Sequence, residues 1–519
     1  MSSSVPKGVA AADFSNALKE FAGVVGKDRV YVDKQPLSSY RDAYSPLADG
    51  EFLPSAAVAP GGVEQIQKIL KIANAYKIPL WTIGTGRNFA YGGPAPRKFG
   101  YVMLDLRRMN RIIEVNEKYG YALVEPGVSY LQLYRHLRAI GSKLWIDPAA
   151  PAWGGVMGNA LEHGAGYTPY GDHFIMQCGM EVVLADGEVV RTGQGALAGS
   201  KHWQVTKHAA GPQFDGMFTQ SNFGVVTKMG IWLMPEPPGY KPFMITYERE
   251  EDLEAIFEIT RPLKVNQIIP NAAVAVDLLW EASAKVTRRH YFDGKGPLPQ
   301  SARTRIASDL KLGMWNYYGA LYGPPPIIEN NWKIVEEALM SIPGAKLYLD
   351  RENDPAWDYR VRLMRGEPNM TEFSIMNWIG GGGHVNFSPI SAPSGAEALA
   401  QYNMIKRRCH EYGFDYIGEF LVGWRDMHHI LMIMYDRADE AMRNRAYDLF
   451  GLLVDEAAEV GFGEYRTHLA FMDQIAKTYK HNDGALWDLH HRIKDVMDPN
   501  GILSPGKQGI WPKAMRETS

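Results

Sequence analysis

Glycine gathers into three tracts that lie far apart along the chain, and these tracts restrict the fold more than any other feature. They read "GTGRNFAYGG" (84–93), "WGGVMGNALEHGAG" (153–166) and "GGGGH" (380–384). Because glycine has no side chain, its backbone N–H groups can approach a ligand closely. The first two tracts together predict a large, flat, phosphate-bearing cofactor, and the third places His384 beside another close approach.

The first tract begins like a dinucleotide-binding fingerprint. Phe89 stands where that fingerprint needs its third glycine, so a Rossmann domain is not favoured. For this loop alone, an ordinary glycine-rich turn is the simpler interpretation. The second tract, with more glycines than tight turns require, favours the cofactor.

Length and charge limit the kinds of partner. The chain has 519 residues, more than one hydrophobic core usually holds, which predicts two or more domains. A net charge of −3 gives no field to attract nucleic acid or an anionic membrane, and we expect neither partner. The sequence shows no signal peptide, no 18-residue apolar run, no disulfide framework and no metal-binding motif. We expect a cytoplasmic protein, with the periplasm as the alternative.

Local patterns predict several elements. Ile66, Ile69, Leu70 and Ala73 lie on one face of a predicted helix that Pro79 stops. Asp186-Gly187 predicts a hairpin turn. After the prolines at 235, 237 and 238, long amphipathic helices alternate with strands, which predicts a domain boundary. We expect the C-terminal tail to fold back on the first domain.

Three candidate site residues have ordinary structural interpretations. His384 taken alone is most simply a hydrogen-bonded core histidine, but the preceding glycines favour a ligand or nucleophile. His428 and its neighbour His429 point to opposite faces of a predicted strand, which argues against a metal site. Arg466, next to Tyr465, could equally be a cation on a surface strand.

Seven stretches together carry a resemblance to a known family. They read "GRNFAYGG", "YALVEPGV", "GYTPYGDHF", "GMFTQSNFGVVTKMG", "GGGGHVNFSP", "WRDMHH" and "GEYRTHLAFMDQI". The chain resembles the 4-alkylphenol branch of the vanillyl-alcohol oxidase and p-cresol methylhydroxylase flavoproteins. The resemblance implies an α+β fold with a two-lobed FAD-binding domain (1–237 and 462–519) and an α+β cap domain (238–461) whose antiparallel sheet covers the flavin ring. A homodimer is the default expectation.

The resemblance also implies how FAD is held. In the vanillyl-alcohol oxidase type, a histidine at the place of His384 is bonded to the flavin. The p-cresol type uses a tyrosine eight residues earlier, where this chain has Met376, so we expect covalent attachment through His384. Lys507 matches a cation near the flavin pyrimidine ring, although an exposed turn lysine is the alternative. The other residues expected at the cofactor are Gly84, Thr85, Gly86, Arg87, Asn88, Pro126, Gly127, Gly158, Asn159, Gly164, Tyr167, Gly224 and Val226.

By the same resemblance, Tyr91, Tyr465 and Arg466 surround the phenolic oxygen of the substrate. A phenol has a pKa of about 10 and is neutral in water at pH 7, so two hydroxyl donors and a cation favour its phenolate. The implied reaction is hydride transfer from the benzylic carbon to flavin N5. Water then adds to the resulting p-quinone methide.

Water addition needs a base, and here the chain departs from the oxidases. Many of them carry an aspartate where this sequence has Ala150, whereas Glu419 matches a glutamate of the p-cresol type. Glu419 is therefore our candidate water activator, and its alternative is a solvated strand residue. His428 and Glu372 are weaker candidates.

Several functions remain open from the sequence. We favour a hydroxylase that passes electrons to a cytochrome c or azurin-like protein, because Ala150 and Glu419 depart together from the oxidase pattern. The alternative is a true oxidase that makes hydrogen peroxide. An alcohol or hydroxy-acid oxidoreductase would not need the two tyrosines and the arginine, and a redox-silent flavin protein would not retain them. Substrates from 4-ethylphenol and eugenol to lignin-derived dimers fit equally well.

Overall fold

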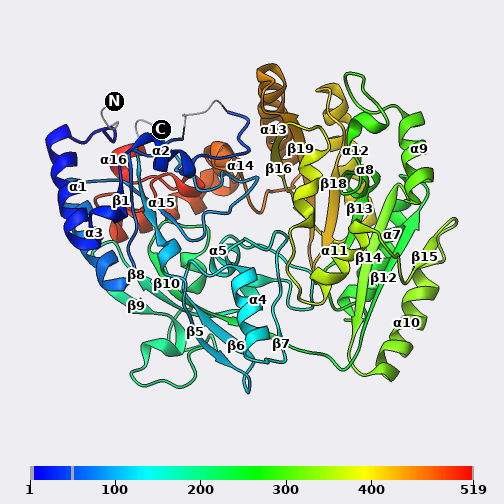
Figure 1. The fold of residues 1–519 in the computed structure, drawn as a ribbon, viewed down its shortest axis with the longest axis horizontal. Coiled ribbons are helices and arrows are strands. Elements are labelled where there is room, and N and C mark those ends of the chain that lie inside the picture. The colour runs from blue at the N-terminus through cyan, green and yellow to red at the C-terminus, as the bar shows by residue number, and fades with distance from the viewer. Residues whose placement is uncertain (1–4, 48–51, 517–519) are drawn as a thin grey trace.

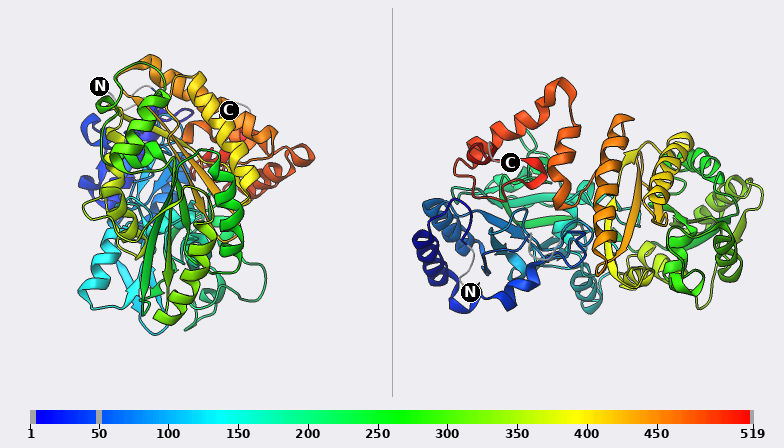
Figure 2. Two further views of the ribbon diagram at one scale, coloured as in Figure 1. Left: turned by 90° about the vertical axis from the view of Figure 1, so that its right-hand side faces the viewer. Right: turned by 90° about the horizontal axis from the view of Figure 1, so that it is seen from above.

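The computed structural model describes residues 5–47 and 52–516. Two halves of the molecule lie side by side in Figure 1, the N-terminal half in blue to cyan and the second half in green to orange. Seen from above in Figure 2, the C-terminal segment in red lies against the first half. In the described part of the chain, we find no helix long and apolar enough to cross a bilayer.

A four-stranded sheet begins the first half. Its strands, in spatial order, are β1 (Val30–Tyr31), β2 (Ala56–Val58), β4 (Val102–Asp105) and β3 (Leu80–Ile83). β4 is parallel to both of its neighbours. Helices α1 (Ala11–Val25) and α3 (Val63–Tyr76) share its hydrophobic core. The apolar face predicted for α3 is buried, but the helix ends at Tyr76, where Lys77 turns left-handed (φ 53°), rather than at Pro79.

A five-stranded antiparallel sheet completes the first half. Its order is β5 (Ile112–Asn116), β6 (Tyr121–Val124), β10 (Val225–Trp232), β8 (Gln177–Val183) and β9 (Val189–Arg191). The predicted hairpin is confirmed, since β8 pairs with β9 and Gly187 takes a φ of 91° in the turn. Helices α4 (Tyr130–Ala139) and α5 (Val156–Leu161) pack on the core of this sheet. Two short strands, β7 (Leu144–Trp145) and β11 (Met234–Pro235), pair with each other.

A large antiparallel sheet forms the second half. Its strands, in order, are β15 (Lys346–Tyr348), β12 (Tyr240–Tyr247), β14 (Trp315–Tyr322), β13 (Ala273–Asp277), β18 (Gly418–Val422), β19 (Met427–Asp436) and β16 (Gly382–Phe387), with β17 (Ile390–Ser391) also paired to β19. The longer helices around it are α7 (Asp252–Val265), α9 (Gln300–Leu310), α10 (Pro325–Leu339), α12 (Gly395–Glu411) and α13 (Glu440–Glu459).

Aromatic contacts show which face of the large sheet these helices cover. Phe420 of β18 packs on Phe257 of α7, and Phe387 of β16 packs on Phe450 of α13. Since side chains alternate along a strand, Glu419 lies on the opposite face from Phe420. That opposite face is turned toward the first half of the molecule and carries the site described below.

The C-terminal segment returns to the first half, as expected. It contains α14 (Met472–Thr478), α15 (Ala485–Met497) and α16 (Lys513–Arg516), and Leu503 pairs with Leu80 of β3. The α+β class is confirmed. Since the large sheet takes its strands from residues 240–436, we propose the division into 1–237 with 462–519 and 238–461.

Candidate active site

A cavity lies between the two sheets of the first half and the C-terminal segment. Its walls come from the loop after β3, the start of α5, the loop before β10 and the turn at residues 503–507. The expected cofactor residues that line it are Gly84, Thr85, Gly86, Arg87, Asn88, Pro126, Gly158, Asn159, Gly224, Val226 and Lys507. Segments remote from one another in sequence thus meet around one space.

One glycine of this cavity, Gly158, leaves room for a ligand. A Cβ atom added at Gly158 of α5 would meet no atom within 4 Å, so it would project into the cavity. Gly127 and Gly164 have another role: their added Cβ atoms would collide with the carbonyl of Arg107 and with the side chain of Asn159. Neither lines the cavity. The cradle around Gly158 fits the FAD that the motifs imply.

Lys507 lines the cofactor cavity, where it forms an ion pair with Glu162. Both side chains are about one-fifth exposed. The cation expected beside the flavin pyrimidine ring is therefore held by a carboxylate that the sequence did not single out.

A second cavity adjoins the first at the face of the large sheet that carries Glu419. Alternate residues of three strands face it, Leu421 with Glu419, Ile430 with Met432, and His384 with Asn386. Tyr167, expected at the cofactor, lines this second cavity instead. The expected site residues that line it are Tyr91, Tyr465, Arg466, Glu372, Glu419 and His384.

Tyr91, Tyr465 and Arg466 gather at the junction of the two cavities. Tyr91 and Arg466 line both, and the Arg466 guanidinium carbon lies 4.4 Å from the Tyr91 ring centroid. Arg466 also donates a hydrogen bond to Asn88 Oδ1 at 2.5 Å. Burial raises the pKa of Tyr465 well above its usual value, with Tyr91 adding to the shift and Arg466 opposing it. Tyr465 is therefore a neutral hydroxyl donor beside a fixed cation.

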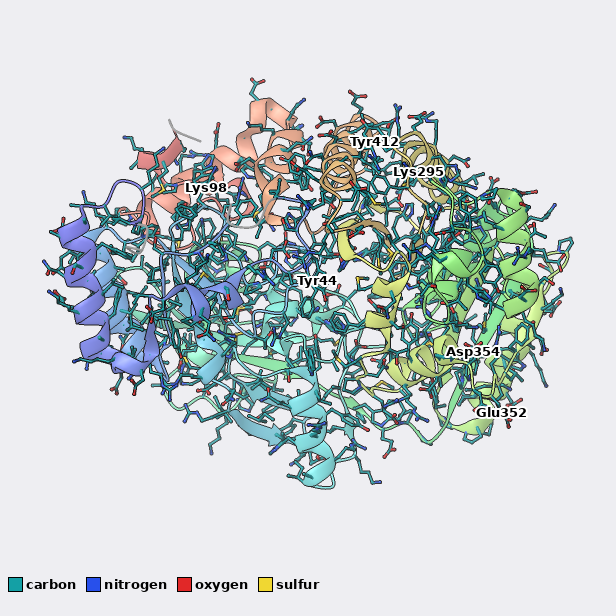
Figure 3. The ribbon with its side chains drawn as sticks, turned by 45° about the horizontal axis from the view of Figure 1, so that its top comes forward. Tyr44, Lys98, Lys295, Glu352, Asp354 and Tyr412 are labelled. Carbon is teal, nitrogen blue, oxygen red and sulfur yellow. The ribbon has the colours of Figure 1, made fainter. Side chains whose placement is uncertain are left out.

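His384 lies on β16 and is buried, with 5% exposure. Burial lowers its pKa to about 4, although the negative charge of Asp42 acts in the opposite direction. Nδ1 has no hydrogen-bond partner among the described residues. The Tyr44 ring packs edge-on at 4.8 Å, and Figure 3 shows Tyr44 at the middle of the molecule, between its halves. His384 is thus a neutral imidazole with a free ring nitrogen, which fits attachment to a cofactor.

Glu419 has a partner that sequence reasoning missed. Arg360, on α11 (Pro355–Met364), donates to Glu419 Oε2 at 3.2 Å and to Glu281 Oε1 at 2.9 Å. The signal was present, since Arg360 lies on the buried face of its helix together with Trp357 and Leu363. A buried arginine is rare unless it is paired.

The two weaker candidates differ in placement. Glu372 lines the second cavity, and burial, with a contribution from Glu419, raises its pKa to about 8. His428 lines neither cavity. Its Nε2 is 2.7 Å from Asp426 Oδ2, and its ring lies 4.3 Å from the Tyr465 ring. His428 therefore supports Tyr465 rather than contacting the cavity.

Two family models match the chain. Residues 54–193 match the FAD binding domain, and residues 266–508 match the C-terminal domain of FAD-linked oxidases. The first match contains two of the glycine tracts, and the second contains the third tract with His384.

Relatives match along nearly the whole chain. The 4-cresol dehydrogenase (hydroxylating) flavoprotein subunit of Pseudomonas putida is 44% identical over 98% of this chain and 97% of its own length. The 4-ethylphenol oxidase of Gulosibacter chungangensis, in complex with isoeugenol, superposes with a TM-score of 0.97 at 44% identity, over 99% of this chain and 100% of that one. The structure of p-cresol methylhydroxylase with substrate bound superposes with a TM-score of 0.95 at 43% identity, over 98% of this chain and 99% of that one. The chain therefore belongs to the vanillyl-alcohol oxidase and p-cresol methylhydroxylase family of FAD-binding flavoproteins.

Proposed function

We propose that this protein uses FAD to oxidise 4-alkylphenols at the benzylic carbon, adds water there, and passes the electrons to a cytochrome or azurin-like protein. The observation that carries this proposal is the meeting of Tyr91, Tyr465 and Arg466 at the junction of the two cavities. A site for a simple alcohol or hydroxy acid has no need of two hydroxyl donors and a cation around one oxygen.

The three residues favour the phenolate form of the substrate. A phenol with a pKa of about 10 loses its proton at neutral pH only if its anion is stabilised, and each tenfold gain in ionisation requires roughly 1.4 kcal/mol. The fixed guanidinium of Arg466 and the two hydroxyls supply that stabilisation. The phenolate then pushes electron density toward the para carbon, and FAD, when bound, supplies the acceptor for the benzylic hydride.

Glu419 is the proposed base for the addition of water. After oxidation the substrate is a p-quinone methide, whose oxygen gains negative charge as water attacks the benzylic carbon. The same three residues stabilise that charge. Glu419 faces the cavity from the large sheet and can remove the proton of the attacking water.

We propose that FAD is attached through His384, which is supported by its neutral, unpaired imidazole. Acid-precipitated wild-type protein should stay yellow, and His384→Ala should release its flavin into the supernatant. Met376→Ala, which changes another residue of the same cavity wall, is the matched control and should keep the flavin bound. A colourless wild-type precipitate would contradict the attachment.

Anaerobic titration with 4-ethylphenol tests the function as a whole. We expect the phenol to bleach the flavin, slow recovery of colour when air is admitted, and fast recovery with an oxidised c-type cytochrome or azurin. Fast recovery in air alone would make the protein an oxidase of the peroxide-forming type. Failure of every phenol to bleach the flavin would overturn the proposed function.

A further inference from the structure

A cluster of three glutamates and one arginine adjoins the second cavity, which Glu419 of the large sheet and Glu372 line. Arg360 lies between Glu281 of α8 (Leu278–Ser283) and Glu419, and all three residues are at most 2% exposed. Glu281 also accepts a hydrogen bond from Tyr318 Oη at 2.8 Å. The third carboxyl group, that of Glu372, faces the cavity from the 3₁₀ segment Thr371–Asn377. Arg360 therefore pairs with two buried carboxyl groups and acts on the third, that of Glu372, through its charge.

Such a cluster cannot carry three full negative charges, because an uncompensated buried charge is costly. Glu372, with a pKa of about 8, holds its proton at neutral pH. Burial also raises the pKa of Glu419, Arg360 acts to lower it, and Glu281 acts to raise it. The other titratable groups that act on this cluster from the packed elements are Tyr167, Tyr318, Tyr359 and, through Tyr318, Asp354. The charge on Glu419 thus depends on how strongly Arg360 interacts with Glu419 and how strongly it interacts with Glu281.

We infer that Arg360 is a positioning residue that holds Glu419 as an oriented carboxylate, that Glu281 competes for it, and that this competition sets the pH at which water addition begins. The inference rests on the proposed function. Glu419 takes one proton from water, the water oxygen bonds to the benzylic carbon, and the electron pair of the quinone methide returns to the phenolate oxygen. Trp280 lines the second cavity, and its Nε1, which has no partner among the described residues, is a donor available to hold that water.

Product partition measures this step separately from the oxidation step. A quinone methide from 4-ethylphenol that water does not capture loses a proton from its methyl group and gains one at its oxygen, which gives 4-vinylphenol. The ratio of alcohol to 4-vinylphenol, measured against pH, therefore reports the ionisation of the base. The fraction of alcohol should fall as the pH falls through the pKa of Glu419, because a protonated carboxyl group cannot take the proton of water.

Two variants should move this transition in opposite directions. Arg360→Met removes the cation, so the midpoint should move toward alkaline pH by about 1–3 pH units. Glu281→Gln leaves Arg360 to Glu419 alone, so the midpoint should move toward acid pH by about one pH unit. Arg360→Lys keeps the charge but loses the planar fork, and its midpoint should lie between those of wild type and Arg360→Met.

Arg303→Met is the matched control, because Arg303 is also buried in the second half and pairs with Asp277 and Glu250 away from the cavity. Its midpoint should equal that of the wild type.

If Arg360→Met does not fold, the shift of the Glu281→Gln midpoint toward acid pH is the result that tests the inference. A purely structural role would leave every midpoint in place, and that result would overturn the inference. Normal bleaching by 4-ethylphenol with unmoved midpoints refutes only the inference, whereas absent bleaching refutes the proposed function.

Discussion

Arg466 is the side chain that the proposed chemistry uses most directly, because the proposal makes it the cation beside the phenolic oxygen. Arg466→Lys replaces a planar fork with a point charge and removes the hydrogen bond to Asn88. A hydrogen bond to a charged group contributes about 1.5–3 kcal/mol, so we expect kcat/KM for 4-ethylphenol to fall by about 10- to 100-fold. Stopped-flow measurement of flavin bleaching checks this.

Arg437→Lys, on the strand end after β19, is the control for the same exchange outside the two cavities and should leave bleaching unchanged. An Arg466→Lys protein that bleaches at the wild-type rate would show that the guanidinium does not act on the phenol.

At the residue scale, only part of the candidate site could be predicted from the sequence. Tyr91, Tyr465 and Arg466 were expected together only because their motifs resemble a family, since no local pattern joins residue 91 to residue 465. The place of Arg360 between Trp357 and Leu363 indicates that its side chain is buried, but its partners lie on two other elements, and pairing over such separations is not visible in local periodicity. Gly127 and Gly164 were expected at the cofactor, but neither lines the cofactor cavity, and their added Cβ atoms would meet the protein itself. The glycine content of a tract does not show which of its glycines face a ligand.

At the scale of elements, α5 forms one wall of the cofactor cavity. Gly158 is the position of α5 where an added side chain would meet open space. Gly158→Leu would fill the cradle, so FAD content should fall severely. The stability of the apoprotein should hold or rise by up to about 1 kcal/mol, because leucine favours a helix over glycine. Flavin absorbance per protein and urea denaturation measure the two effects.

Gly23→Leu is the matched control, since Gly23 also lies in a helix, α1, with open space beside it, but outside the cofactor cavity. It should keep the full flavin content. Equal flavin in both variants would contradict the placement of the cofactor against α5.

Elements with a strong local signal were predictable. The buried face of α3 and the hairpin between β8 and β9 follow from helical periodicity and from the Asp-Gly turn. The order of strands in the large sheet was not predictable, because β13 pairs with β14 and also with β18, which comes much later in the chain. Such pairings depend on the packing of the whole sheet.

At the scale of the whole molecule, a buried ion pair inside the C-terminal segment holds the lysine that joins this segment to the first half. Lys494 and Asp498 are fully buried, and Lys494 Nζ also donates to the carbonyls of Asn222 and Leu503. Lys494→Met leaves the Asp498 charge without its cation, so the free energy of unfolding should fall by about 3–5 kcal/mol in urea denaturation. Asn222 and Leu503 line the cofactor cavity, so flavin should also be lost more easily.

Lys494→Met combined with Asp498→Asn removes the unpaired charge and should recover part of the stability. A loss below about 1 kcal/mol in the single variant, far less than an unpaired buried charge costs, would show that the segment is held by its other contacts alone.

The return of the C-terminal tail to the first half was expected from its Pro/Gly turns and from the resemblance, and Leu503 pairs with Leu80 as this expectation requires. The ion pair itself was not predicted, because Lys494 resembles any polar position of an amphipathic helix. Its burial results from packing against Asn222, which is remote in sequence.

The protonation state of a phenol bound in the site tests the central claim most directly. A phenol without a benzylic hydrogen, added to the flavin-loaded protein at pH 7, binds without being oxidised, and its ultraviolet difference spectrum reports its protonation. The gathering of Tyr91, Tyr465 and Arg466 predicts the absorption of a phenolate, lost in Arg466→Lys. The absorption of a neutral phenol in the wild-type protein would contradict the account.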